Sequence, residues 1–237
     1  MKLTIIIPVF NEKKTISEII KRVIKVEIPD FEKEIVIVDD GSTDGTIEHI
    51  EKSIRGTNIK FLKHKKNQGK GAAIKTGVSK ATGDYIIIQD ADLEYNPKDI
   101  ERLTIPIKDK ISQVVYGTRL HRWPNLARDE KTLQFLVHYF GNRFLSLLTS
   151  ILYGQWITDM ETCYKLFPRK ALTLVELNSK GFNFEPEITA KLMKMGYKIL
   201  ELPITTNPRS YEEGKKLNTI KDGTIALYTL LKYRFVD

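Results

Sequence analysis

Short apolar runs alternate along the first hundred residues with segments in which apolar side chains recur every three or four positions. The short runs, rich in isoleucine and valine, lie at 3–10, 34–38, 59–62 and 85–88. The segments with helical spacing lie at 15–24, from about 44 onward, and at about 72–81. β-Branched runs that alternate with amphipathic segments are typical of parallel strands joined by helices. The pattern therefore predicts an α/β fold with a doubly wound, mostly parallel sheet.

The second half of the chain adds longer helices to this pattern. Further strands are predicted at 113–119 and 197–204, a polar loop from 158 enters a short strand, and helices are predicted at 185–195 and 217–235. From Leu133 to Leu152 apolar side chains form a stripe wider than one core contact requires. We expect Gly141 to divide this stripe into two helices.

Length and composition limit the class of protein. With 237 residues, 41% of them hydrophobic and 29% charged, the chain suits one large globular α/β domain with a small appendage. No apolar run approaches the ~18 residues of a spanning helix, and Met1 leads into a strand without a signal peptide. The single cysteine, Cys163, excludes a disulfide within the chain and favours a reducing, cytoplasmic location.

The chain carries a net charge of +8 and has a pI near 9.3, which suits an anionic partner. Nucleic acid, a phosphorylated substrate and an acidic membrane surface all meet this condition. The sequence contains no recognised nucleic-acid-binding motif, so we expect no nucleic-acid partner.

Candidate chemistry is concentrated after the predicted strand at 85–88, where Asp90, Asp92 and Glu94 occupy alternate positions. Ligands bind at the carboxyl ends of strands in open α/β sheets, and alternate side chains of an extended backbone share one face. The three carboxylates are therefore expected to converge on Mg²⁺ or Mn²⁺, whose remaining ligands would be phosphate oxygens of a diphosphate substrate. The alternative is an ordinary acidic turn before the next helix.

Four segments in order resemble the signatures of family 2 glycosyltransferases with the GT-A fold, and they lie at 7–12, 38–46, 67–73 and 90–94. Five later segments are similar to the polyprenyl-phosphate branch of that family, which includes dolichyl-phosphate mannosyltransferase, and they lie at 117–119, 158–159, 184–187, 196–197 and 214–217. The resemblance covers about 3–235. It implies a GT-A catalytic domain at 1–205, including amphipathic helices at about 132–153, followed by an acceptor loop and C-terminal amphipathic helix at 206–237.

The resemblance assigns a nucleotide-binding role to a set of residues at the strand ends. These are Pro8, Phe10, Glu12, Asp40, Lys70, Asp90 and Ala91. An aromatic ring at Phe10 can pack on the base, carboxylates accept bonds from ribose hydroxyls, and Lys70 offsets phosphate charge. Gly69 and Gly71 are expected to let the backbone approach the nucleotide. The alternatives are that Asp39 and Asp40 are turn acids and that 69–71 is a plain helix-entry turn.

The resemblance also implies a reaction centre made of Asp92, Asp159 and Arg119, with Asp90, Asp92 and Glu94 at the metal. The family often has glutamine at the position of Glu94. Asp159 is expected to face the sugar or the acceptor; in the alternative it caps a turn with Thr158. Cys163 stands where the family commonly has glycine, and we interpret it as a small buried hydrophobic residue.

A lipid phosphate acceptor would explain why no strong general base is found, because a phosphate monoester is already anionic near neutral pH. It needs cationic positioning, which the resemblance assigns to Arg119, Arg128 and Arg209, with Arg122 as an alternative second arginine. For each arginine the alternative is a solvated surface side chain.

The stripe at 133–152 resembles the interfacial helices of that branch, which would lie in the membrane surface; alternatively it only covers the sheet. The function implied is metal-dependent, inverting transfer of a hexose from GDP-mannose or UDP-glucose to a polyprenyl or dolichyl phosphate at the cytoplasmic membrane face. A membrane-anchoring protein is a further implied partner. The alternatives are transfer to a soluble or polysaccharide acceptor and a nucleotide-sugar-binding regulator without turnover.

Overall fold

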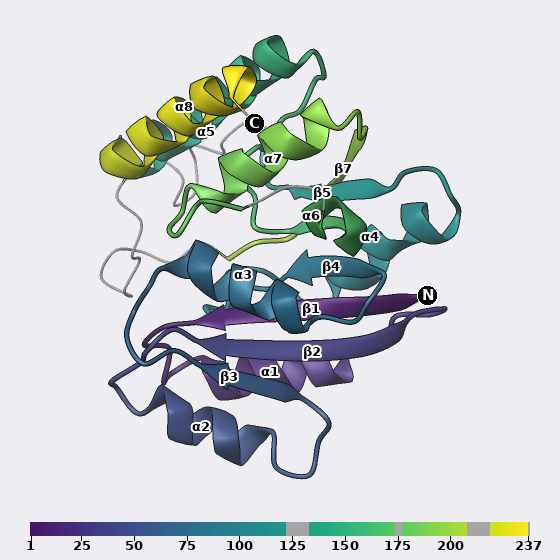
Figure 1. Cartoon of the computed structure of the whole chain (residues 1–237), viewed down its shortest axis with the longest axis vertical. Helices are drawn as coiled ribbons and strands as arrows, with labels where there is room; N and C mark the ends of the chain where they lie inside the picture. The colour runs from purple at the N-terminus through teal and green to yellow at the C-terminus, as the bar shows by residue number, and fades with distance from the viewer. Residues whose placement is uncertain (122–132, 174–176, 208–218, 237) are drawn as a thin grey trace.

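A computed structural model describes residues 1–121, 133–173, 177–207 and 219–236 (Figure 1). Its seven-stranded sheet has the order β3-β2-β1-β4-β6-β5-β7. The strands are β1 (Lys2–Val9), β2 (Glu32–Asp39), β3 (Lys60–Lys63), β4 (Tyr85–Ile88), β5 (Val114–Thr118), β6 (Lys165–Pro168) and β7 (Ile199–Pro203). All paired strands are parallel except β6, which is antiparallel to both β4 and β5. The predicted mostly parallel α/β sheet is confirmed.

Eight described helices flank the sheet. They are α1 (Ile16–Lys25), α2 (Thr46–Ser53), α3 (Lys70–Lys80), α4 (Asp99–Lys108), α5 (Leu133–Tyr153), α6 (Arg169–Thr173), α7 (Phe184–Lys194) and α8 (Thr219–Phe235). In Figure 1, α3 lies in front of β1 and β2 and α1 lies behind the sheet. Ile5, Ile6 and Ile7 of β1 are fully buried, as a strand covered on both faces requires.

Gly141 does not divide the long apolar stripe, so that prediction was wrong. The stripe is one helix, α5, and a Cβ built at Gly141 would meet no atom within 4 Å. A glycine inside a helix costs only about 1 kcal/mol relative to alanine. Packing of α5 against α7 and α8 offsets that cost, and the helix continues through Gly141.

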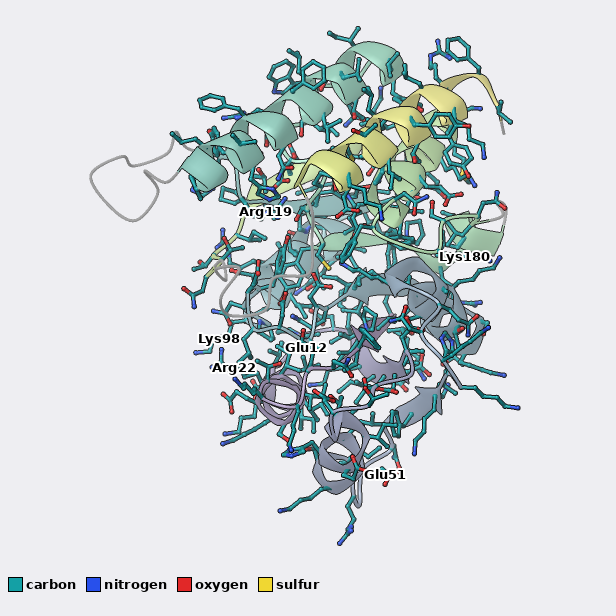
Figure 2. All side chains as sticks on the ribbon, turned by 90° about the vertical axis from the view of Figure 1, so that its left-hand side faces the viewer. Glu12, Arg22, Glu51, Lys98, Arg119 and Lys180 are labelled. Atoms are coloured by element: carbon teal, nitrogen blue, oxygen red, sulfur yellow. The ribbon has the colours of Figure 1, made fainter. Side chains whose placement is uncertain are left out.

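Helices α5 and α8 lie side by side at one end of the molecule (Figures 1 and 2). The Tyr153 hydroxyl of α5 donates a hydrogen bond to the Leu230 carbonyl of α8 at 2.7 Å. No described helix combines the length and the apolar composition of a transmembrane span. The two helices instead form an outer layer over α7 and the strands beyond β4.

Candidate active site

A cavity of about 420 Å³ lies where the predicted site residues come together. It is lined by ten of them: Pro8, Phe10, Glu12, Asp40, Lys70, Asp90, Ala91, Asp92, Glu94 and Arg119. Figure 2 looks toward this end of the sheet, with Glu12 below Arg119 and the α5–α8 layer above both. The other arginines expected at the acceptor phosphate lie outside the described residues; they are Arg122, Arg128 and Arg209.

The loops that follow β1 and β2 hold each other in place. The backbone N–H of Asn11 donates to Ser42 Oγ at 2.8 Å, and the Thr43 N–H donates back to Asn11 Oδ1 at 2.9 Å. The Glu12 N–H donates to Thr46 Oγ1 at 2.9 Å, at the first residue of α2. Because both loops are fixed, Phe10 and Glu12 present their side chains at one wall of the cavity.

Asp39 and Asp40 bind backbone amides. Asp39 Oδ1 accepts from the N–H groups of Gly41 and Ser42, as expected of a turn acid. The Asp40 carboxylate accepts from the N–H groups of Gln68 and Gly69, the latter at 2.7 Å, and contacts His64 Nδ1 at 2.7 Å. Asp40 thereby fixes the loop in front of α3, and its role toward a ribose stays a prediction.

The close approach at Gly69 and Gly71 involves the protein backbone. A Cβ at Gly69 would lie 2.3 Å from the Lys180 carbonyl oxygen, and one at Gly71 would lie 2.5 Å from that of Ser179. Gly69 also has φ +99°, which favours glycine. These glycines allow a close approach of the segment before α7, and their expected role in letting the backbone approach a nucleotide stays a prediction.

Lys70 lies between two carboxylates. Its Nζ is 2.9 Å from Asp90 Oδ1 and 2.9 Å from Glu185 Oε1, and its side chain is 15% exposed. Burial favours the neutral amine, but the neighbouring Asp90 and Glu185 charges raise the pKa of Lys70 well above its ordinary value. Lys70 therefore stays charged and ties the turn after β4 to the start of α7.

The three acidic residues after β4 do not converge as the extended-strand argument predicted. The strand ends at Ile88, Leu93 has φ +65°, and Asp92 Oδ1 accepts the Glu94 N–H at 3.1 Å, so the segment is a turn. Within the described part of the chain no three His, Cys, Asp or Glu side chains are placed to hold one metal ion. Asp92 and Glu94 still line the cavity, and carboxylate oxygens suit Mg²⁺ when substrate phosphates complete the shell.

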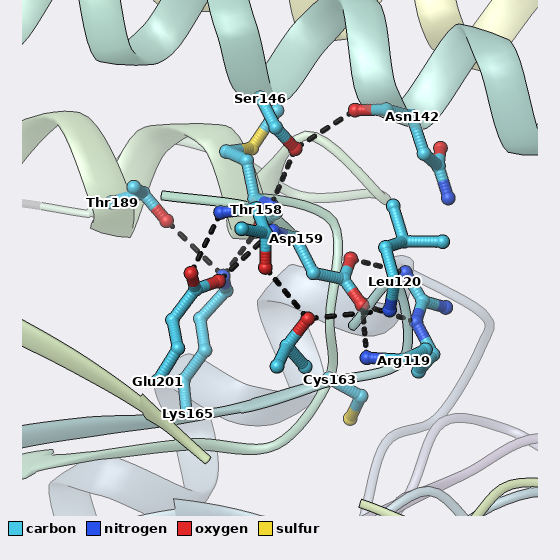
Figure 3. A network of polar contacts seen from close by, with 12 residues as sticks. Arg119, Leu120, Asn142, Ser146, Thr158, Asp159, Cys163, Lys165, Thr189 and Glu201 are labelled. Carbon is cyan, nitrogen blue, oxygen red and sulfur yellow. Dashed lines mark hydrogen bonds and ion pairs between the residues drawn. The ribbon is translucent and has the colours of Figure 1, made fainter. Parts of the chain in front are cut away.

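Arg119 and Asp159 form a bidentate ion pair (Figure 3). Arg119 donates from Nε to Asp159 Oδ2 at 2.8 Å, from Nη2 to Oδ1 at 2.7 Å, and from its backbone N–H to Oδ2 at 2.8 Å. Burial opposes a charge on Asp159, but the guanidinium lowers the pKa of that carboxyl below its ordinary value. Asp159 is fully buried and is not among the described residues that line the cavity, whereas Arg119, 21% exposed, is. Asp159 thus contacts the cavity-lining Arg119 without lining the cavity itself, and its predicted role toward the sugar or the acceptor phosphate stays a prediction.

Two further carboxylates line the cavity: Glu161, from the loop before β6, and Glu185, from the first turn of α7. Burial and the Glu185 charge raise the pKa of Glu161 to about 8. Sequence reasoning assigned no site role to either residue, since an acid in the first turn is explained by the helix N-terminus. The spacing of Glu161, two residues after Asp159, was the available signal.

His138 lines the same cavity from α5. The long apolar helix therefore forms part of the cavity wall in addition to the outer layer. Cys163 is buried and also lines the cavity, in agreement with its interpretation as a small buried side chain.

The chain is similar in sequence to known proteins over most of its length. A family model described as glycosyl transferase family 2 matches residues 4–174. An uncharacterized protein of Methanocaldococcus jannaschii is 30% identical over 221 residues, covering 91% of this chain and 86% of that protein. A dolichol-phosphate mannosyltransferase of Pyrococcus furiosus is 29% identical over 240 residues, covering 98% of this chain but only 64% of that protein.

Solved structures show a related fold. A glucosyl-3-phosphoglycerate synthase from Mycobacterium tuberculosis, in complex with Mn²⁺, uridine diphosphate and phosphoglyceric acid, matches with a TM-score of 0.74 and 18% identity. The match covers 100% of this chain and 79% of that chain. At this identity the similarity establishes the arrangement of strands and helices alone.

Proposed function

This chain belongs to glycosyltransferase family 2, and from that premise we propose that it transfers a hexose from a nucleotide diphosphate sugar to a polyprenyl phosphate at a membrane surface. The observation that carries the proposal is that one cavity contains both the predicted nucleotide-binding residues and the ion-paired Arg119. GDP-mannose and UDP-glucose are the candidate donors.

The nucleotide would occupy the wall formed by the loops after β1 and β2. Phe10 would pack on the base, and Glu12 and Asp40 would accept hydrogen bonds from ribose or base. Asp92 and Glu94, with Asp90 beside them, would hold Mg²⁺ or Mn²⁺ together with the diphosphate oxygens. The metal would supply electrostatic stabilisation of the departing diphosphate.

Arg119 would hold the acceptor phosphate. Asp159 fixes the guanidinium from behind through two side-chain bonds, so Arg119 is pre-organised at the cavity wall. Arg128 and Arg209 are proposed as further phosphate ligands. In the transfer, an acceptor phosphate oxygen bonds to the anomeric carbon while the bond from that carbon to the donor phosphate oxygen breaks. The electron pair leaves with the nucleoside diphosphate, and the configuration inverts.

The exposed face of α5 and α8 supports a lipid acceptor. Large apolar side chains are exposed on both helices, at Val137, Phe140, Phe144, Leu147, Ile151, Ile225, Tyr228, Leu231 and Phe235. Exposed Lys221, Lys232 and Arg234 on α8 add positive charge suited to anionic headgroups. Since α5 also contributes His138 to the cavity, a bilayer on this face would lie next to the site. We propose that this face, called the α5–α8 face below, lies in the membrane surface.

The test incubates the protein and Mg²⁺ or Mn²⁺ with labelled GDP- and UDP-sugars, with and without a short polyprenyl phosphate. We expect label in the lipid phase, lost with EDTA and in Asp92→Ala, but retained in Asp109→Ala, which removes an exposed acid outside the cavity. Label transferred to water-soluble material without lipid would replace the lipid acceptor by a soluble one. Donor binding without any transfer would indicate a regulator.

Membrane binding is tested separately with anionic vesicles. Phe140→Ser combined with Phe144→Ser should weaken sedimentation with vesicles about tenfold, because two exposed apolar anchors are lost. Ile111→Ser, which replaces an exposed apolar residue outside the α5–α8 face, is the matched control. Unchanged vesicle binding by the double variant would contradict a membrane contact at this face. A wild-type dimer in sedimentation that the double variant dissociates would show that a second copy of the chain covers the face.

A further inference from the structure

Two carboxylate oxygens at the cavity have no hydrogen-bond partner within the part of the chain that the structure describes. They are Glu161 Oε1 and Glu185 Oε2, and both atoms are buried. A buried carboxylate oxygen without a partner is costly, roughly 1–3 kcal/mol or more. Both side chains line the cavity, so a bound ligand with hydrogen-bond donors would remove this cost.

The nearby cations are engaged with other groups. Lys70 lies between Asp90 and the other oxygen of Glu185. Lys165 donates from Nζ to Thr189 Oγ1 at 3.1 Å (Figure 3). Its Nζ also donates to the Met160 carbonyl at 2.6 Å and lies over the Tyr116 ring. Neither lysine forms an ion pair with Glu161 among the described residues. Glu161 Oε1 and Glu185 Oε2 are therefore not bound by either lysine, and a ligand in the cavity could bind them.

The chemistry of the pair determines which part of a ligand it can contact. The Glu185 carboxylate, which is ion-paired with Lys70, would repel a phosphate, and both carboxyl groups can accept hydrogen bonds from neutral hydroxyl groups. Glu185 is joined through Lys70 to Asp90, on the donor side of the cavity. Glu161 is two positions after Asp159 in the sequence. Asp159 in turn binds Arg119, the proposed ligand of the acceptor phosphate. Both side chains line the same cavity as the residues proposed to hold the two phosphates.

We propose that Glu161 and Glu185 form a subsite that binds hydroxyl groups of the transferred hexose and determines which hexose is accepted. The inference rests on the proposed function, since it assumes a nucleotide sugar donor. The pair serves as a specificity determinant because each carboxylate binds a hydroxyl in one position. A hexose without that hydroxyl would leave the carboxylate oxygen unpaired and would bind more weakly. The raised pKa of Glu161 supports this, as a protonated carboxyl can both donate to and accept from a hydroxyl.

The test compares binding of a nucleoside diphosphate with binding of the corresponding nucleotide sugar by calorimetry. Glu161→Ala should weaken binding of the nucleotide sugar about tenfold and change nucleoside diphosphate binding less than about twofold, because only the sugar loses a partner. Glu161→Gln keeps the shape and should not lower the melting temperature, since Oε1 has no partner to lose. Glu101→Ala, an exposed acid on α4, is the matched control.

Deoxy donors identify the hydroxyl involved. If Glu161 binds one hydroxyl, the donor lacking that hydroxyl should bind the wild type and Glu161→Ala with nearly equal affinity, while the other deoxy donors keep the tenfold difference. Equal loss of nucleoside diphosphate and nucleotide sugar binding, or the same tenfold loss with every deoxy donor, would overturn the subsite. If the wild type binds no nucleotide at all, the proposed function fails, and the subsite fails with it.

Discussion

The two sides of the cavity are built in different ways. On the side of β1 and β2, the carboxylates of Asp39 and Asp40 bind backbone N–H groups of nearby turns. On the side of β5 and β6, side chains bind each other, as Arg119 does with Asp159. A side made of backbone contacts depends on local turn sequence, whereas a side made of side-chain pairs depends on the fold that brings the pairs together. Substitutions should therefore affect the two sides differently.

The largest effect is expected at the side-chain pair. Arg119→Ala removes the proposed phosphate ligand and leaves the fully buried Asp159 without its cation. We expect kcat/KM to fall about 100-fold and the free energy of unfolding to fall by about 3 kcal/mol. Initial rates and urea denaturation measure the two losses. Arg22→Ala, which removes an ion pair with Glu18 in which both side chains are exposed, should change neither, and a similar loss there would contradict the assignment.

The next largest effect is expected at Gly69, where the loop before α3 contacts the segment before α7. Gly69→Ala would put a Cβ 2.3 Å from the Lys180 carbonyl at a φ of +99°, so the loop or the segment before α7 must move. We expect a loss of about 3 kcal/mol in the free energy of unfolding. Gly56→Ala is the matched control, because Gly56 has φ +76° but nothing within 4 Å of the added Cβ. It should lose only about 1 kcal/mol, and equal losses would show that the contact with Lys180 is unimportant.

The difference between the two sides also explains what the sequence could predict. The strands of the first half were predictable because β-branched runs such as Ile86–Ile88 are buried on both faces. The loops after β1 and β2 were predictable because their motifs are local. The antiparallel direction of β6 and the contacts of Lys70 with Asp90 and Glu185 are not local properties. They arise when segments that are distant in the sequence meet, such as Lys70 and Glu185 or the paired residues Ile87 and Leu166, which periodicity does not reveal.

Some local features were also missed. Helix α4 went unpredicted although Ile100, Leu103 and Ile107 have helical spacing, and Pro106 lies inside it near its C-terminal end. The alternation of Asp90, Asp92 and Glu94 was interpreted as an extended backbone after the strand, but the left-handed φ of Leu93 turns the chain. A non-glycine residue with positive φ is uncommon and is poorly indicated by sequence alone.

A smaller effect is expected on the β1 and β2 side of the molecule, away from the cavity. Glu34, buried in β2, accepts bonds from Lys60 Nζ, Thr4 Oγ1 and the Thr82 N–H. Burial opposes its charge, yet these bonds lower the pKa of Glu34 from 4.5 to about 2. Its contribution is therefore fully present above pH 4.5 and is lost as the pH falls toward about 2. Glu34→Gln should cost about 2 kcal/mol at pH 6 and less at pH 3, measured by urea denaturation.

Glu32→Gln is the control for this pH dependence, since Glu32 lies in the same strand but is 71% exposed in its pair with Lys2. It should change the free energy of unfolding by less than about 0.5 kcal/mol at either pH. If Glu34→Gln cost the same at pH 3 as at pH 6, the hydrogen bonds from Lys60, Thr4 and Thr82 would not depend on the charge of Glu34.

The smallest effect is expected in α5, which lies in the outer layer of helices. Gly141→Ala places a methyl group where no atom lies within 4 Å and reduces the freedom of the unfolded chain. The free energy of unfolding should rise by about 0.5–1 kcal/mol, measured by urea denaturation, without a change in turnover. Gly77→Ala on α3 is the opposite control, because its Cβ would lie 2.6 Å from Ile6 Cγ2 in β1 and should destabilise the protein. If Gly141→Ala also destabilised it, the space around Gly141 would not accommodate the added methyl group.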